Sequence, residues 1–148
     1  MAGWDEVAQA VVVGDGAARF DELRVRLLGW RFHERAGLRV RDRPPRVLPG
    51  ATARLRVPWL PWVEAPVRVW SVIDEPGRAG FTCTTLPGHP VEGVEELFLD
   101  LADSGQVTFT VRSRARPALW WTRALPWATR AVQRIIVRRY LSAAAARV

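Results

Sequence analysis

Five segments in the middle of the chain alternate between apolar and polar residues, and this period of two is typical of half-buried β-strands. Short turn sequences separate several of them: Pro76-Gly77, Pro87-Gly88 and Asp103-Ser104-Gly105. Turns this short join antiparallel neighbours, because a parallel crossover needs about a dozen residues or more. The pattern therefore predicts one antiparallel sheet. The five expected strands cover residues 53–57, 67–73, 81–85, 95–101 and 107–111.

Helical periodicity flanks this region on both sides. A helix is expected over residues 17–36, because Phe20, Leu23, Leu27 and Trp30 share one of its faces, and a short strand is expected before it at residues 10–13. From Pro117 the period is helical again, and Pro126 should begin a new helix or kink the old one.

The terminal helix has an apolar stripe that must be buried. Its members are Trp121, Leu125, Ala128, Val132, Ile135 and Ile136. The order of elements therefore predicts an α+β fold in which a curved antiparallel sheet of about six strands wraps around the long C-terminal helix.

Composition limits the class of protein. The 148 residues, 49% of them apolar and 25% charged, suit one globular domain over residues 1–148. No apolar run approaches the roughly 20 residues of a membrane span, and the first residues lack the pattern of a secretory signal. Cys83 is the only cysteine, so no internal disulfide is possible and a cytoplasmic location is expected. We expect no metal and no cofactor, because neither ligand clusters nor a phosphate-binding loop occur.

The positive charge is concentrated at the end of the chain. The net charge is +7, and from Arg112 onward the chain has nine Arg and no Asp or Glu. On the terminal helix, Arg123, Arg130, Arg134 and Arg138 lie opposite the apolar stripe. This row is either a solvated face or a surface that docks on an anionic membrane. Nucleic acid is a less favoured partner, because no recognition motif is present.

Several short blocks of sequence are distinctive. The most specific are Gly80-Phe81, Thr85-Leu86-Pro87-Gly88-His89-Pro90, Gly93 and Glu95, and others are Val13-Gly14-Asp15-Gly16 and Arg138-Arg139-Tyr140-Leu141. Together they resemble an uncharacterised family, domain of unknown function nineteen-ninety. The resemblance implies the helix-grip architecture of START-like and birch-pollen-allergen-like (SRPBCC) proteins, with an apolar cavity between sheet and helix and no established reaction. The sequence departs from the family pattern at Cys83-Thr84, where an aromatic residue and a glycine are usual, and at Val94, where an acid is usual.

Glu95 is in phase with Leu97 and Leu99, so its carboxylate should face the interior of the sheet. A buried carboxylate needs a partner. Arg139 is the cation on the apolar side of the last helix, and we predict that it pairs with Glu95. The pair would either orient a polar group of a ligand or join the sheet to the helix.

The chain is therefore predicted to bind a small hydrophobic or lipid-like molecule in a cavity between the sheet and the C-terminal helix. An alternative is an enzyme of the cyclase or hydrolase type, in which His89 acts as a general base beside Glu95. The alternative for His89 itself is that its ring only fixes its loop by hydrogen bonds to the backbone. A third function for the chain is that of a basic module that docks on an anionic membrane or nucleic acid. The residues expected to line the cavity are Trp70, Phe81, Cys83, His89, Glu95, Leu97, Phe109, Ile136, Arg139 and Tyr140.

Overall fold

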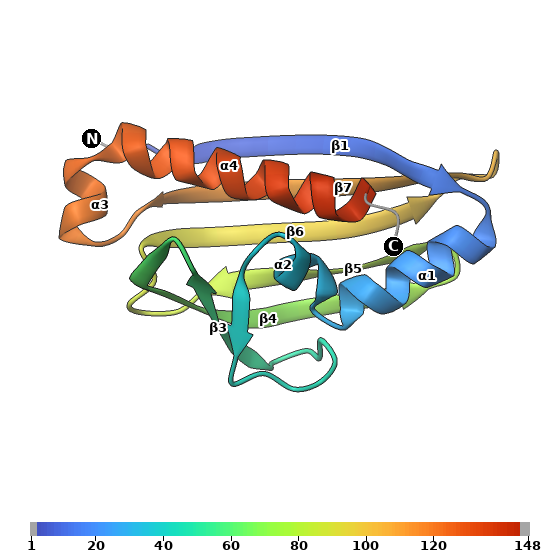
Figure 1. Cartoon of the computed structure of the whole chain (residues 1–148), viewed down its shortest axis with the longest axis horizontal. Coiled ribbons are helices and arrows are strands. Elements are labelled where there is room, and N and C mark those ends of the chain that lie inside the picture. Colours follow the sequence, from blue (N-terminus) through green and yellow to red (C-terminus); the bar gives the residue numbers. More distant parts are fainter. Residues whose placement is uncertain (1–2, 146–148) are drawn as a thin grey trace.

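The computed structural model of the chain describes residues 3–145 (Figure 1). Within this range, seven antiparallel strands form one open sheet in the order β1-β7-β6-β5-β4-β3-β2. The strands are β1 (Asp5–Asp15), β2 (Arg39–Arg41), β3 (Thr52–Val57), β4 (Leu60–Glu75), β5 (Arg78–Thr85), β6 (Val91–Leu101) and β7 (Gln106–Pro117). The helices are α1 (Ala17–Leu28), α2 (Arg31–Arg35), α3 (Trp120–Ala124) and α4 (Pro126–Ala145). The expected α+β class is confirmed, with seven strands in place of about six.

The predicted turns lie where the strands of the sheet reverse direction. Pro76-Gly77 joins β4 to β5, Pro87-Gly88 joins β5 to β6, and residues 103–105 join β6 to β7. The amide of His89 donates to the carbonyl oxygen of Leu86 at 3.1 Å, which closes the second of these turns. Pro126 begins the new helix α4, which is one of the two outcomes expected at this residue.

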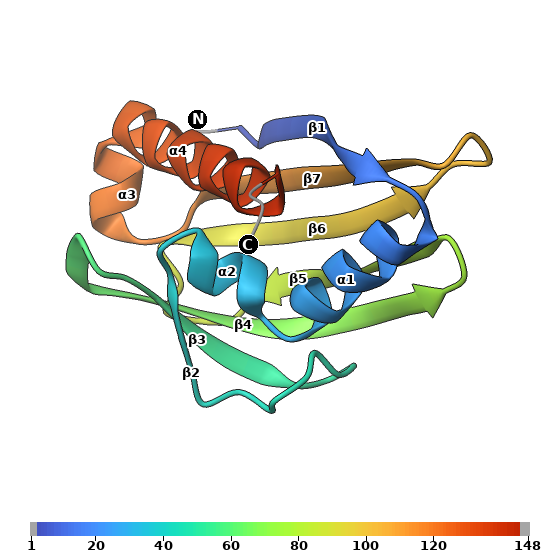
Figure 2. The ribbon, with the colours of Figure 1, turned by 45° about the vertical axis from the view of Figure 1, so that its right-hand side comes forward.

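All the helices lie on one face of the sheet. Figure 1 shows α4 running along β1 and β7, with α1 beside it over the β5–β6 side, and Figure 2 shows the same arrangement after rotation. The opposite face of the sheet carries no helix among the described residues. Any enclosed space in this molecule therefore has to lie between the helices and the inner face of the sheet.

The N-terminal helix is shorter than expected, because the chain breaks at Trp30. The single helix predicted over residues 17–36 is two helices, and Trp30 between them has a left-handed backbone with φ of 67°. This conformation is unusual for a residue with a side chain. The Trp30 indole Nε1 donates to the carbonyl oxygen of Pro44 at 3.1 Å, and its side chain is completely buried. Burial and this hydrogen bond offset the cost of the backbone conformation.

A β-bulge in β4 changes which residues face the core. Val69 pairs with Cys83 and Ser71 pairs with Thr82, so Trp70 is the extra residue between them. The Trp70 side chain is 71% exposed. The prediction that Trp70 lines a cavity is therefore wrong. After the bulge Val72 pairs with Phe81 and packs against the core.

The terminal helix is buried over its second half only. Val137, Tyr140, Ala143 and Ala144 are buried. The residues of the first half are half-buried or exposed, and Ile135 of the predicted apolar stripe is 42% exposed. The first half of α4 is therefore packed less closely than the second half.

The contact between Trp30 and Pro44 is testable by substitution. Trp30→Phe removes the indole donor and leaves a small void in the core, while Arg43 Nη1 still donates to the Pro44 carbonyl at 3.2 Å, so we expect a loss of about 2 kcal/mol in the free energy of unfolding. Urea denaturation measures this change. Trp70→Phe is the matched control and should change stability by less than about 0.5 kcal/mol, because Trp70 is exposed. Equal losses in the two variants would contradict this description of the helix break.

Candidate functional site

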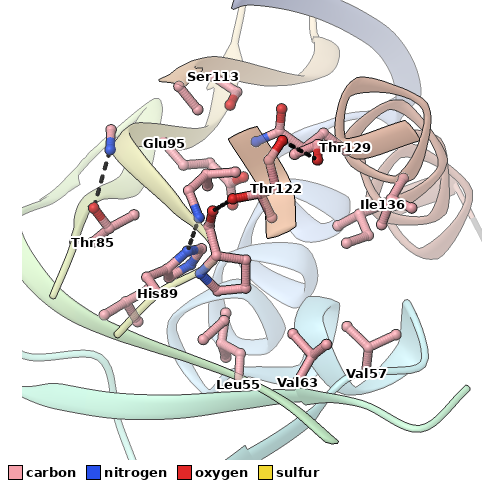
Figure 3. A pocket seen from close by; sticks show the side chains of 18 of the residues that line it. Leu55, Val57, Val63, Thr85, His89, Glu95, Ser113, Thr122, Thr129 and Ile136 are labelled. Carbon is pink, nitrogen blue, oxygen red and sulfur yellow. Dashed lines mark hydrogen bonds between the residues drawn. The ribbon is translucent and has the colours of Figure 1, made fainter. Parts of the chain in front are cut away.

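A cavity of about 230 Å³ lies between the inner face of the sheet, the β3–β4 hairpin and the first half of α4. Figure 3 shows its walls: Thr85, Glu95 and Ser113 come from the sheet, Leu55, Val57 and Val63 from the hairpin, and Thr129 and Ile136 from α4. Most lining residues are apolar. The volume is slightly below the roughly 300 Å³ at which typical ligand pockets begin.

Three side chains form a row across the sheet at the floor of this cavity. Cys83 on β5 pairs directly with Glu95 on β6, and Glu95 pairs with Ser113 on β7. Directly paired residues in antiparallel strands have Cβ atoms about 5 Å apart on the same face. The sheet register therefore fixes the position of Glu95 between a thiol and a hydroxyl. Tyr140 of α4 also lines the cavity.

Glu95 has no charged partner in the described part of the chain. The expected ion pair with Arg139 is not formed. The Arg139 Nη1 atom instead donates to the carbonyl oxygen of Ala36 at 3.3 Å, and its guanidinium lies 5.7 Å from the centre of the Trp59 ring. Burial raises the pKa of Glu95 from 4.5 to about 7. The cavity therefore holds a carboxyl group that ionises near neutral pH and that pairs with no cationic side chain of residues 3–145.

His89 is held in a form that suits a structural role. Its Nδ1 atom accepts a hydrogen bond from the amide of Val91 at 3.1 Å, so in the neutral ring the proton is on Nε2. Burial lowers the pKa of His89 from 6.5 to about 4. His89 lines the same cavity as Glu95, but neither of its ring nitrogens is free to accept a proton at neutral pH. The structure thus supports the interpretation that His89 fixes its loop.

His33 is a cavity residue that the sequence analysis missed. It lies on α2, is 2% exposed, and its ring meets the Tyr140 ring edge to face at 5.0 Å. Its Nδ1 atom is buried and has no hydrogen-bond partner within residues 3–145. Burial lowers its pKa to about 4, so the ring is neutral. In the single helix expected over residues 17–36, His33 falls three residues after Trp30 on the same apolar face, and this spacing is the signal that could have found it.

Half of the residues expected in the cavity line it. Cys83, His89, Glu95, Ile136 and Tyr140 are lining residues. Phe81, Leu97 and Phe109 are completely buried in the core instead, and Trp70 and Arg139 lie outside the cavity. The hairpin wall was not predicted, because contacts between segments so far apart in the sequence leave no local pattern. The polar side chains Thr129 and Gln133 on α4 were not predicted either.

The remaining expectations concern the surface and metal binding. No helix within residues 3–145 is long and apolar enough to cross a membrane. Over the same range, no group of three or more His, Cys, Asp or Glu residues is placed to hold a metal ion. The four Arg residues of the predicted row are exposed, and Arg134 Nη2 contacts Asp5 Oδ1 at 3.2 Å.

Comparison with known proteins gives a family and a fold. Residues 2–143 match the model of "Domain of unknown function (DUF1990)". A UPF0548 protein of Deinococcus radiodurans is 33% identical over 141 residues, which cover 88% of this chain and 71% of that protein. A hypothetical protein of Helicobacter pylori shares the fold with a TM-score of 0.72 at 9% identity, over 95% of this chain and 86% of that one. A protein of Nitrosospira multiformis has a TM-score of 0.57 at 14% identity, over 93% and 94% of the two chains.

The buried carboxylate predicts a specific dependence of stability on pH. Because the pKa of Glu95 is raised in the folded state, stability is lost as the pH rises from about 4.5 through about 7. Glu95→Gln removes this loss, so at pH 8 the variant should be more stable than the wild type by up to about 3 kcal/mol. At pH 5 the two should be nearly equal. Urea denaturation at both pH values measures the difference.

Glu96→Gln is the matched control for this prediction. Glu96 is the next residue on β6 and points to the opposite face of the sheet, away from the cavity. Its substitution should give no such pH-dependent gain. A gain in Glu95→Gln that is the same at pH 5 and pH 8 would contradict the assignment of the titrating group.

Proposed function

This chain belongs to the DUF1990 family, whose description names no activity, and we propose that it binds a small hydrophobic molecule in the cavity between the sheet and α4. The observation that carries the proposal is the apolar cavity itself. Protein interiors are normally close-packed, because the walls of an empty apolar space lose their dispersion contacts and this costs stability. A ligand of matching shape restores those contacts.

The architecture supports the same proposal. We interpret the sheet and α4 as a helix-grip fold of the START-like kind, in which a C-terminal helix lies against the inner face of an antiparallel sheet. The second half of α4 is anchored in the core, while the first half borders the cavity. A ligand can therefore occupy the space beside the first half of α4 while the second half stays packed in the core. Leu125, a lining residue that is 48% exposed, marks where the cavity meets solvent, and this position offers an entry path.

The positions at which this sequence departs from the family pattern lie in the cavity wall. Cys83, Thr84 and Val94 all line it. Cys83, on the inner face of β5, is smaller than an aromatic residue and so changes the shape of the space. We therefore expect the ligand of this chain to differ from that of relatives that keep the usual residues.

The enzyme alternative has less support. General base catalysis requires a nitrogen that can accept a proton near neutral pH. Both ring nitrogens of His89 are occupied, one by the Val91 amide and the other by its own proton. Binding without reaction is therefore the function that we propose.

Blocking the cavity tests the proposal. Toluene is a suitable neutral probe, and NMR of methyl groups in the ¹³C-labelled chain detects its binding. In the wild type, saturable shifts are expected at Val57, Val132 and Ile136, which line the cavity. Ala128→Phe places a ring in the same space and should weaken toluene binding at least about tenfold, a loss of roughly 1.4 kcal/mol or more.

Ala131→Phe is the control, because Ala131 is exposed on the same helix and lies outside the cavity. It should bind toluene as the wild type does. The proposal fails if toluene causes no saturable shift in the wild type, or if Ala128→Phe and Ala131→Phe bind it equally well.

A further inference from the structure

We propose that the ligand of this cavity is an apolar amine, whose positively charged ammonium group binds the Glu95 carboxylate. The inference rests on the proposed function and adds the chemical class of the ligand. The inference depends on the ionisable groups that line the cavity.

The cavity wall contains one acidic group, and no basic side chain among its described residues is charged at neutral pH. Glu95 is the only Asp or Glu among the described lining residues, and none of these residues is an Arg. The chain has no Lys at all. Arg139, the cation that the sequence placed nearest, is turned away toward Ala36 and Trp59. Within residues 3–145, the group that would neutralise Glu95 is therefore missing.

An ammonium group would supply the positive charge that the cavity wall lacks. A buried charge is costly unless it is paired and hydrogen-bonded. An ammonium group has three donors and no acceptor. The carboxylate of Glu95 accepts one of them, and the Ser113 hydroxyl beside it in the sheet register is a further acceptor. The apolar walls formed by the hairpin and α4 would surround the rest of the molecule.

The same arrangement excludes carboxylic acids. The carboxylate of a fatty acid would lie beside Glu95, and two like charges in an apolar space repel strongly. His33 and His89 cannot offset this repulsion, because burial lowers the pKa of each to about 4 and keeps both rings neutral. The cavity should therefore discriminate between amines and acids of the same length.

Only Glu95 among the groups at this site titrates near neutral pH. Cys83 faces it from β5, and burial and the charge of Glu95 raise the pKa of that thiol far above its usual range. Tyr140 faces it from α4, and burial followed by the charge of Glu95 raises its pKa well above 10. His33 on α2 and His89 in the turn before β6 are both neutral above pH 5. A change in affinity between pH 6 and pH 8 therefore reports on Glu95.

Three six-carbon ligands distinguish an amine site from one that prefers a neutral or an acidic group: hexylamine, 1-hexanol and hexanoate. Calorimetric titration of the whole chain at pH 8 should show that hexylamine binds more tightly than 1-hexanol and that hexanoate does not bind. The affinity for hexylamine should rise about tenfold from pH 6 to pH 8, because Glu95 ionises with a pKa of about 7. The affinity for 1-hexanol should not change with pH.

Glu95→Gln keeps the size of the side chain and removes its charge. It should weaken hexylamine binding by at least about tenfold and leave 1-hexanol binding within about twofold. Glu96→Gln, on the other face of β6, should leave both unchanged. Equal binding of hexylamine and 1-hexanol, binding of hexanoate, or an unchanged affinity in Glu95→Gln would overturn the amine assignment and leave the proposed function intact. Failure of all three ligands to bind would overturn the proposed function itself.

Discussion

Anchoring of α4 by its second half is the constraint on which the rest of the structure depends. Tyr140 and Ala144 are completely buried against the sheet and α2, so the direction of the helix is fixed at that end. The residues of its first half are half-buried or exposed. The first half of α4 therefore borders a space, and the β3–β4 hairpin closes the side of that space that the helix leaves open (Figure 3).

The electrostatics of the cavity follow from the same geometry. The sheet register places Glu95 on the inner face of β6, where it lines the cavity. Because the nearby histidines are neutral and Arg139 points elsewhere, the carboxylate remains unpaired in the described part of the chain. An unpaired buried charge destabilises the free protein, and such groups are often retained at sites of function.

Local patterns in the sequence predicted the elements that local interactions determine. The turns at Pro76-Gly77 and Pro87-Gly88 and the helix start at Pro126 depend on backbone preferences of a few residues, and all of them are where expected. The inward direction of Glu95 followed from the period of β6. These features placed the sheet, its antiparallel direction and the central residue of the candidate site.

The features that the sequence did not reveal depend on contacts between distant segments. The break at Trp30 requires the Pro44 carbonyl to accept from its indole, and no local signal predicts that contact. Strand β2 has three residues, which is too short for a period to be visible. The bulge at Trp70 reverses the facing of the residues after it, so simple alternation misplaced Val72, which packs against the core together with Val69. Arg139 lies on the helix where expected, but Ala36 and Trp59 draw it away from Glu95.

Xenon binding tests the central claim, that an accessible apolar cavity lies between the sheet and the first half of α4. Xenon enters dry apolar cavities and needs no polar group. In ¹²⁹Xe NMR of the whole chain, the account predicts a saturable shift, with matching methyl shifts at Val132 and Ile136. A xenon shift that rises linearly with protein concentration, without saturation and without those methyl shifts, would mean that the space is filled and would contradict the account.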